Sequence, residues 1–374
     1  MRGLVTYWTG IWDPGREAVS GQVEALRRGG RRGIVVSYSR GQGSKLLFKE
    51  GVVRLSRRQY PSLRALAMLL EPLGRVTHVV GGLGDWHLLR SLGRRPVLLT
   101  VAVPGGIEPS DFVGKVSLFA AESETLRNDL VTIGVPPDRI RIVYPGIDLA
   151  RFSPSPLPAA GPFRLLFAST PSNVRELQVR GIPLLAELAR AVPDVEIVVL
   201  WRRWGNEQAA REALERLSPP RNFEIVFRDA ADMAAEYRRC HAVACCYAAG
   251  FGKSCPNSIV EALACGRPAL VTSTVGISGL IGRASAGVVT ERTLDELVGG
   301  LAELRRRNEE LSRNARALAV SQFDVNVFRA RYQALYEELA GCCQPSAFSC
   351  QLAATVLDDA AARPSPHLTA HAGS

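Results

Sequence analysis

The chain has 374 residues, of which 47% are hydrophobic and 22% charged, and it carries a formal net charge of +10. This is the composition of an ordinary globular protein, and the length exceeds what one core usually supports, so we expect two domains. No run of about 18 apolar residues occurs, which argues against a membrane-spanning helix. The start, 1–8, becomes polar too quickly for a signal peptide and reads as a strand, so we expect a cytoplasmic protein.

Short apolar runs alternate with amphipathic stretches in the first half, which is typical of parallel α/β architecture. The strands expected there are 3–8, 33–38, 51–55, 76–80, 97–101, 116–121 and 140–143. The helices expected there are 14–28, 62–70, 86–91 and 123–133. Asp13 followed by Pro14 predicts the N-cap and the first position of the first helix.

A segment rich in proline and glycine, 144–158, predicts a linker between two domains. The alternation then restarts, with strands expected at 163–168, 196–200, 223–227, 242–246, 269–272 and 287–289. Helices are expected at 182–191, 207–217, 233–239 and 256–264, followed by a mainly helical stretch from 293 to 339. From 341 to 374 the periodicity is lost, which predicts a disordered tail.

The positive charge is concentrated in the first half. Residues 1–153 contain 22 Lys and Arg against 13 Asp and Glu, whereas the remainder contains 24 against 23. A general preference for Arg explains why Arg outnumbers Lys 42 to 4, but it does not explain this asymmetry. A basic surface attracts acidic lipid headgroups or phosphorylated substrates. No basic-aromatic module occurs, so nucleic acid is not expected as a partner.

Cysteine usage does not indicate a metal site. All eight cysteines follow residue 239, and none forms a C-x-x-C pair with companion histidines. We therefore expect reduced and mostly buried thiols, and no bound metal.

The segment with the clearest chemical character joins the strand 242–246 to a helix that begins near Pro256. Gly252 and its neighbouring glycine permit positive φ and a close approach of the backbone to a ligand. The helix start presents the free amides of Asn257 and Ser258 and a partial positive charge. Together these features predict an anion site suited to a diphosphate.

Two charged side chains accompany this anion site. Glu261 lies one turn deeper in the helix, where a carboxylate can accept two hydrogen bonds from a vicinal diol such as that of ribose. Lys253 lies in the glycine loop and is the only lysine after residue 115. A compact cation in such a loop indicates a phosphate contact.

The stretch NSIVEALACGRPAL, 257–270, resembles the signature of the family-4 retaining glycosyltransferases, which have the GT-B fold. The stretches AESE, VYPGID and VTSTVGI agree with it, at 121–124, 143–148 and 271–277. The resemblance is clear over 96–340. It implies two Rossmann-like domains that face each other across a cleft. The acceptor-side domain is expected at 1–153 and the nucleotide-sugar donor domain at 154–323. A last helix, 324–340, is expected to pack back on the first domain.

By this resemblance, Glu261 holds the ribose of the donor nucleotide. The family usually has another glutamate eight positions earlier, where this chain has Lys253. The family also supplies two cations for the diphosphate; Ser169 occupies the position of the first, and Arg180 matches the second. Arg202 and Lys253 are candidates to restore the missing charge, and a solvated surface position is the alternative for each arginine.

The resemblance is weaker on the acceptor side, where the histidine that the family often uses is absent. His78 and His87 flank a glycine loop that contains Asp85, and a loop carboxylate can orient hydroxyl groups. Trp12 and Glu17 replace the paired glycines of the family. We take Asp85, Trp12 and Glu17 as acceptor-side candidates, although capping and packing explain Trp12 and Glu17 equally well.

The resemblance implies transfer of a hexose, with retention, from a nucleotide-diphosphate sugar to a glycan, lipid-linked or small-molecule acceptor. Lys253 and Arg180 would stabilise the leaving diphosphate. The nucleotide sugar is a co-substrate, and no cofactor is expected. The basic first domain predicts peripheral contact with an anionic membrane at its inner face. Two alternatives remain: a GT-B protein that binds nucleotide sugars without transfer, and an epimerase. An oxidoreductase is disfavoured because no G-x-G-x-x-G follows the first strand.

Overall fold

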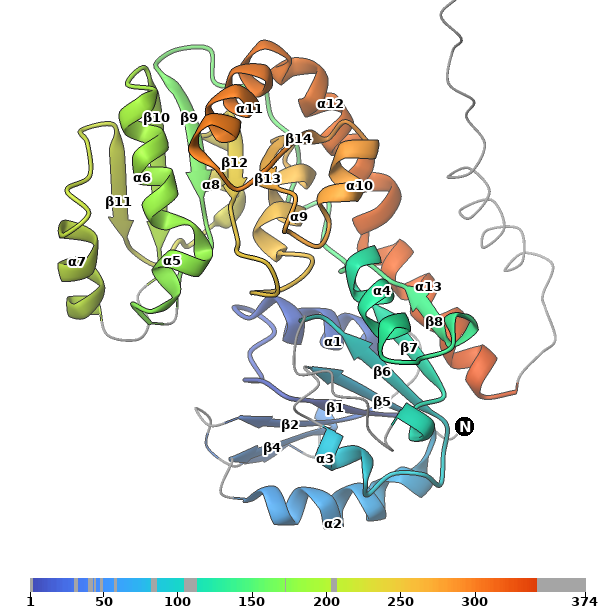
Figure 1. The fold of residues 1–374 in the computed structure, drawn as a ribbon. Coiled ribbons are helices and arrows are strands. Elements are labelled where there is room, and N and C mark those ends of the chain that lie inside the picture. Colours follow the sequence, from blue (N-terminus) through green and yellow to red (C-terminus); the bar gives the residue numbers. More distant parts are fainter. Residues whose placement is uncertain are drawn as a thin grey trace, which may run out of the picture.

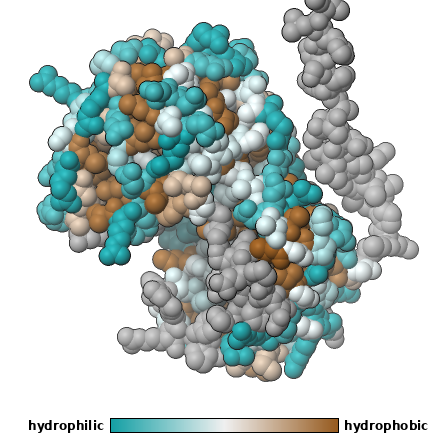
Figure 2. Space-filling view, viewed as in Figure 1, coloured by the Kyte–Doolittle hydropathy of each residue, from teal (hydrophilic) through white to brown (hydrophobic). Residues whose placement is uncertain are grey.

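The computed structural model describes residues 3–29, 33–39, 43, 45–47, 50–56, 59–81, 86–103, 113–171, 173–202 and 207–341. These residues form two sheets flanked by helices, one in each half of the chain (Figure 1). The α/β fold expected from the alternating pattern is confirmed. Figure 2 shows two lobes on which hydrophilic and hydrophobic surface residues are intermixed. No helix in the described part of the chain is long and apolar enough to cross a membrane.

The first sheet has the strand order β3-β4-β2-β1-β5-β6-β7-β8, and only the β3–β4 pair is antiparallel. Its strands are β1 (Gly3–Trp8), β2 (Ile34–Ser39), β3 (Lys45–Leu47), β4 (Val52–Ser56), β5 (Gly74–Gly81), β6 (Val97–Val101), β7 (Leu118–Ala121) and β8 (Ile140–Ile142). Its helices are α1 (Ala18–Arg28), α2 (Tyr60–Leu70), α3 (Trp86–Leu89) and α4 (Glu124–Thr132), with the 3₁₀ turns η3 (Glu71–Leu73), η5 (Val113–Lys115) and η6 (Pro137–Arg139). The central strands β1, β5, β6 and β7 are buried on both faces, as their continuous apolar runs predict.

The second sheet is entirely parallel and has the order β11-β10-β9-β12-β13-β14. Its strands are β9 (Phe163–Phe167), β10 (Val195–Trp201), β11 (Phe223–Phe227), β12 (Ala242–Cys245), β13 (Ala269–Thr272) and β14 (Gly287–Thr290). Its helices are α5 (Glu176–Arg180), α6 (Ile182–Ala191), α7 (Glu207–Glu215), α8 (Met233–Arg238), α9 (Asn257–Ala264), α10 (Ser278–Arg283), α11 (Leu294–Arg306) and α12 (Asn308–Leu318), and the π-helical η7 (Ala319–Phe323) follows. The five described cysteines are free and buried here.

The last helix, α13 (Val325–Leu339), returns to the first sheet (Figure 1). Its buried face, which includes Phe328 and Tyr332, packs with Leu4 and Leu98 of the first domain. The chain crosses between the domains twice at one place, since the amide of Ile147 donates to the carbonyl of Phe323 over 2.7 Å. The two crossings therefore form one paired connection.

His78 lies beneath α13 and is fully buried. Its Nδ1 and the Tyr336 hydroxyl are 2.9 Å apart, and its Nε2 and the Thr100 hydroxyl are 2.7 Å apart. Thr100 in turn contacts the Tyr332 hydroxyl at 2.7 Å. Burial lowers the pKa of His78 to about 3, so the ring is neutral at physiological pH. His78 thus satisfies the polar groups under α13.

The structure corrects two details of the expected elements. The first helix begins at Ala18 rather than Pro14, and Glu17 rather than Asp13 is its N-cap, because the Glu17 carboxylate accepts from the amides of Val19 and Ser20. Three short elements, β3, α5 and α10, were not predicted because three to six residues carry too little periodicity. The predicted tail, apart from Gly341, lies outside the described residues.

Candidate functional site

The strand order of the second sheet reverses between β9 and β12, and the polar residues of the site gather there. In open α/β sheets, ligands bind at the carboxyl ends of the strands beside such a reversal. Ser169 follows β9 and Tyr247 follows β12, and their hydroxyls are hydrogen-bonded to each other. Arg180, the last residue of α5, donates from Nη1 to Ser169 over 2.8 Å and to Tyr247 over 3.3 Å.

Arg180 is held firmly in this position. It pairs with Glu176 at 2.8 Å, and its guanidinium lies 5.2 Å from the ring centroid of Phe251. The next residue, Gly181, has φ +81°, and a Cβ there would lie 2.4 Å from the carbonyl oxygen of Cys246. Only glycine allows α5 to end so close to β12, so the backbone fixes where the guanidinium points.

The glycine loop after β12 adopts the backbone conformation expected of it. Gly250 has φ +68° and Gly252 has φ +77°. A Cβ on Gly252 would lie 2.7 Å from Cε2 of Tyr247, whereas a Cβ on Gly250 would meet nothing within 4 Å. Gly252 therefore lets the loop pack against Tyr247, and Gly250 only lets it turn.

Helix α9 begins directly after this loop, with Pro256 as its N-cap and no side-chain cap on its first amides. Its N-terminus carries a partial positive charge that can bind an anion. The Oδ1 of Asn257 accepts from Nζ of Lys253 at 3.0 Å and from Nε2 of Gln22 at 3.4 Å. Since Gln22 lies on α1, the first domain contributes to this helix start.

Glu261 lies one turn further along α9 and accepts a 2.8 Å hydrogen bond from the Tyr237 hydroxyl. Burial raises the pKa of Glu261 to about 7, against the opposing effects of this hydrogen bond and of Arg151, Arg202 and Lys253. The carboxylate is therefore desolvated but surrounded by positive charge. Hydrogen bonds donated by the hydroxyl groups of a ligand would stabilise such a carboxylate.

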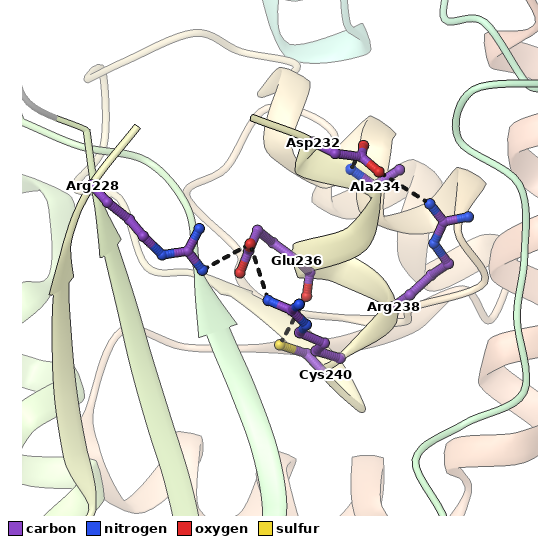
Figure 3. Close-up of polar contacts among 7 residues, drawn as sticks. Arg228, Asp232, Ala234, Glu236, Arg238 and Cys240 are labelled. Atoms are coloured by element: carbon purple, nitrogen blue, oxygen red, sulfur yellow. Dashed lines mark hydrogen bonds and ion pairs between the residues drawn. The ribbon is translucent and has the colours of Figure 1, made fainter. Parts of the chain in front are cut away.

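Polar contacts surround α8, the helix that carries Tyr237 (Figure 3). Asp232 caps the helix by accepting from the amide of Ala234 at 3.0 Å. Glu236 pairs with Arg228 at 2.8 Å and with Arg239 at 3.4 Å. Figure 3 shows Glu236 pointing toward Arg228, which follows β11. These bonds hold α8, whose buried residues include Tyr237, the hydrogen-bond partner of Glu261 on α9.

Lys253 forms an ion pair with Glu122, which the sequence analysis did not select. The Nζ–Oε2 distance is 3.0 Å, and the side chains are 16% and 5% exposed. Glu122 follows β7 in the first domain. A charged residue directly after a buried strand in the AESE stretch was the available signal, but its partner lies in the other domain.

Four sequence-predicted candidates remain: Arg202, Trp12, Glu17 and Asp85. Arg202 is exposed; its amide donates to Thr170 at 2.8 Å, and its charge lowers the pKa of Glu261. Trp12 is buried in a small apolar cluster with Trp8, and Glu17 caps α1. Packing and capping therefore account for both. Asp85 lies outside the described residues.

A family model matches part of the second half of the chain. Residues 172–307 match the family model of glycosyl transferases group 1. No curated protein sequence matches the chain. Among the residues that the structure describes, no group of three or more His, Cys, Asp or Glu could hold a metal ion.

Several solved structures share the fold of about 90% of the chain. Anabaena HepE in complex with UDP-glucose aligns with a TM-score of 0.71 and 18% identity, covering 90% of this chain and 100% of HepE. Sucrose-phosphate synthase from Thermosynechococcus elongatus aligns with a TM-score of 0.71 and 14% identity, covering 91% and 100%. A glycosyltransferase from Rickettsia africae aligns with a TM-score of 0.68 and 14% identity, covering 90% of this chain and 98% of that protein. These similarities establish the GT-B fold.

Proposed function

We propose that the chain, which has the GT-B fold, is a glycosyltransferase that moves a hexose, with retention, from a UDP-sugar to a hydroxylated acceptor. The observation that carries this proposal is the pairing of an uncapped helix start at Asn257 with the desolvated carboxylate of Glu261. A nucleoside diphosphate carries both a diphosphate and a diol, the two groups that these features of the site can bind. The crystal forms of HepE with UDP and UDP-glucose support this class of donor.

Each donor contact follows from the chemistry of the site. The amides of Asn257 and Ser258 would bind the diphosphate, and Gly252 allows it to approach the backbone. Arg180 would neutralise charge on the leaving diphosphate, since it already lies where the strand order reverses between β9 and β12. Glu261 would accept hydrogen bonds from the ribose hydroxyls.

Arg202 would add to the positive potential around the nucleotide, because its charge already acts on Glu261. In this scheme the protein positions the donor and stabilises the departing UDP, and no covalent intermediate with a side chain is required.

Release of UDP from UDP-glucose and related UDP-sugars, with and without simple sugar acceptors, tests the function. We expect slow hydrolysis by the wild type, faster turnover with an acceptor, and an α-configured initial product by proton NMR. Glu261→Ala should abolish release while the circular dichroism spectrum stays unchanged. Tight UDP binding without any release would instead favour a nucleotide-sugar-binding protein without transferase activity, and appearance of a second free UDP-sugar would favour an epimerase.

For the acceptor, we propose a lipid-linked or glycan substrate reached at an anionic membrane surface. The helix α2 and the turn η3 expose three apolar side chains, Met68, Leu69 and Leu73. Among the described residues from 59 to 103, the single acidic side chain is Glu71, which is buried, whereas five arginines are present. Apolar side chains within a basic surface fit an anionic bilayer. A cavity of about 410 Å³ near by is lined by Arg75 and Arg95.

Sedimentation with vesicles tests this contact. We expect binding to vesicles that contain phosphatidylglycerol, loss of binding at high salt, and little binding to neutral vesicles. Leu69→Glu should weaken the binding, whereas Val320→Glu, at an exposed apolar site of the second domain, should not. Absence of salt-sensitive binding by the wild type would overturn the membrane proposal.

A further inference from the structure

A short loop of the second domain, 253–255, is hydrogen-bonded to the first domain. The amide of Ser254 donates to the carbonyl of Ala102, after β6, over 3.0 Å. The hydroxyl of Ser254 lies 2.6 Å from that of Ser123, the N-cap of α4. Gly276 leaves room for this arrangement, since a Cβ there would lie 1.7 Å from Oγ of Ser254. The loop that precedes α9 is therefore held from both domains.

The ion pair between Glu122 and Lys253 lies next to these contacts and is shielded from water. Burial raises the pKa of the Glu122 carboxyl, and the ammonium of Lys253 opposes that rise. A buried carboxylate without its cation is strongly destabilising, so each partner requires the other when the domains meet. When the domains separate, both groups regain water. The pair therefore requires the two domains to be in contact.

Lys253 also connects this pair to the donor site. Its Nζ donates to Oδ1 of Asn257 at 3.0 Å, and Asn257 is the first residue of α9. A row of contacts thus runs from Glu122 through Lys253 to the helix start that would bind the diphosphate. Because Glu122 already compensates the charge of Lys253, this lysine is a poor direct ligand for phosphate. Arg180, which lies between the ends of β9 and β12, is the better candidate.

We propose that Glu122 and Lys253 are positioning residues that couple closure of the two domains to the geometry of the donor site. Glu122 acts through Lys253, which orients Asn257 and the glycine loop when the cleft closes. This assignment rests on the proposed donor site, and it replaces the direct catalytic role that the sequence suggested for Lys253.

A second ion pair between the domains supplies a matched control. Glu124, on α4, pairs with Arg283, on α10, but their side chains are 44% and 58% exposed. Exposed ion pairs of this kind contribute little free energy to the association of the two domains. The two pairs join the same domains, and only the buried one contacts α9. A generic effect of lost interdomain charge would appear in both, whereas positioning would appear in one.

The test compares four full-length proteins with the wild type: Glu122→Gln, Lys253→Met, the charge swap Glu122→Lys with Lys253→Glu, and Glu124→Gln. The first two variants should lower kcat for UDP release about tenfold or more. The uridine affinity of Glu122→Gln, which keeps Lys253 and its effect on Glu261, should stay within twofold of the wild type. The swap should recover much of the loss, because the Asn257 amide can turn its NH₂ toward a carboxylate. Glu124→Gln should stay within twofold of the wild type.

Small-angle scattering with saturating UDP gives a readout that does not depend on turnover. We expect the wild type, the swap and Glu124→Gln to contract with UDP, and Glu122→Gln and Lys253→Met to remain extended. Contraction of all variants, or a swap no better than the single variants, would overturn the inference. If the wild type contracts with UDP but releases none from any UDP-sugar, the transfer reaction fails and the coupling stands.

Discussion

The hydroxyl of Tyr237 donates a 2.8 Å hydrogen bond to Oε2 of Glu261, and this bond joins α8 to α9 inside the second domain. Burial is the main cause that raises the pKa of Tyr237 well above its ordinary value, and the charge of Glu261 adds to it. Tyr237 therefore stays protonated and serves Glu261 as a fixed donor. One oxygen of the carboxylate is oriented by the protein.

Replacing Tyr237 with Phe should move the pH dependence of nucleotide binding. The tyrosine hydrogen bond lowers the pKa of Glu261, which is about 7 in the presence of that bond. Without it, the carboxyl should stay protonated to higher pH, so UDP affinity should fall at pH 7 and recover at higher pH. Calorimetric titration with UDP between pH 6 and 9 should show the midpoint rising by about one unit. An unchanged midpoint would show that the bond does not act on Glu261.

Glu261→Gln should stabilise the free protein at alkaline pH while weakening donor binding. The folded-state pKa of Glu261 is about 7, above its ordinary value of 4.5, so the folded state retains a proton that the unfolded chain loses. The stability contributed by the protonated carboxyl is fully present below pH 4.5 and is lost as the pH rises through 7. Glutamine mimics the protonated form at every pH.

Thermal unfolding from pH 4.5 to 8 measures this difference. The melting temperature of Glu261→Gln relative to the wild type should increase with pH and level off above pH 7. The matched control is Glu215→Gln on the exposed face of α7, which should show no such trend. A difference that is the same at all pH values would contradict the assigned pKa.

The two loop glycines should respond differently to alanine. Gly250→Ala should cost only the backbone penalty of a positive φ, about 1–2 kcal/mol, since its Cβ meets nothing within 4 Å. Gly252→Ala pays a similar penalty and also places its Cβ 2.7 Å from Tyr247, which holds Arg180. Chemical denaturation and UDP titration should show that only Gly252→Ala loses UDP affinity by more than its loss of stability accounts for. Equal losses of UDP affinity in Gly250→Ala and Gly252→Ala would show that the diphosphate binds elsewhere.

Arg180→Gln should weaken UDP binding more than uridine binding, because the guanidinium would contact phosphate and not the nucleoside. We expect a loss of about tenfold for UDP and less than about twofold for uridine. Arg211 is a suitable comparison, since it also pairs with a glutamate four residues earlier, at 2.6 Å. Arg211→Gln should leave both affinities unchanged. Equal losses for UDP and uridine in Arg180→Gln would indicate a structural role.

The sequence predicted the parts of the site that lie within one continuous segment. The strand, the glycine loop and the start of α9 follow one another along the chain, and local patterns describe them well. The positive φ of Gly252 is one such expectation, and the structure confirms it. Most strands were located within two residues because buried parallel strands are continuous apolar runs.

Contacts between distant segments could not be predicted in this way. Glu122 and Lys253 lie 131 positions apart, and their pairing depends on how the two domains face each other. The bond between Tyr237 and Glu261 depends on the packing of α8 against α9. Glu17 became the cap of α1 because its carboxylate reaches two amides, a competition that the Asp-Pro pattern does not reveal.

The most direct test of the donor site is a thermal-shift measurement with UDP-glucose on the wild type and Glu261→Ala. At a concentration about 100-fold above Kd, binding contributes about 2.7 kcal/mol, so the wild type should melt about 3–4 °C higher. Glu261→Ala should fold and show almost no shift. A shift of equal size in both proteins, or none in the wild type with any nucleotide sugar, would contradict a donor site built on α9 and Glu261.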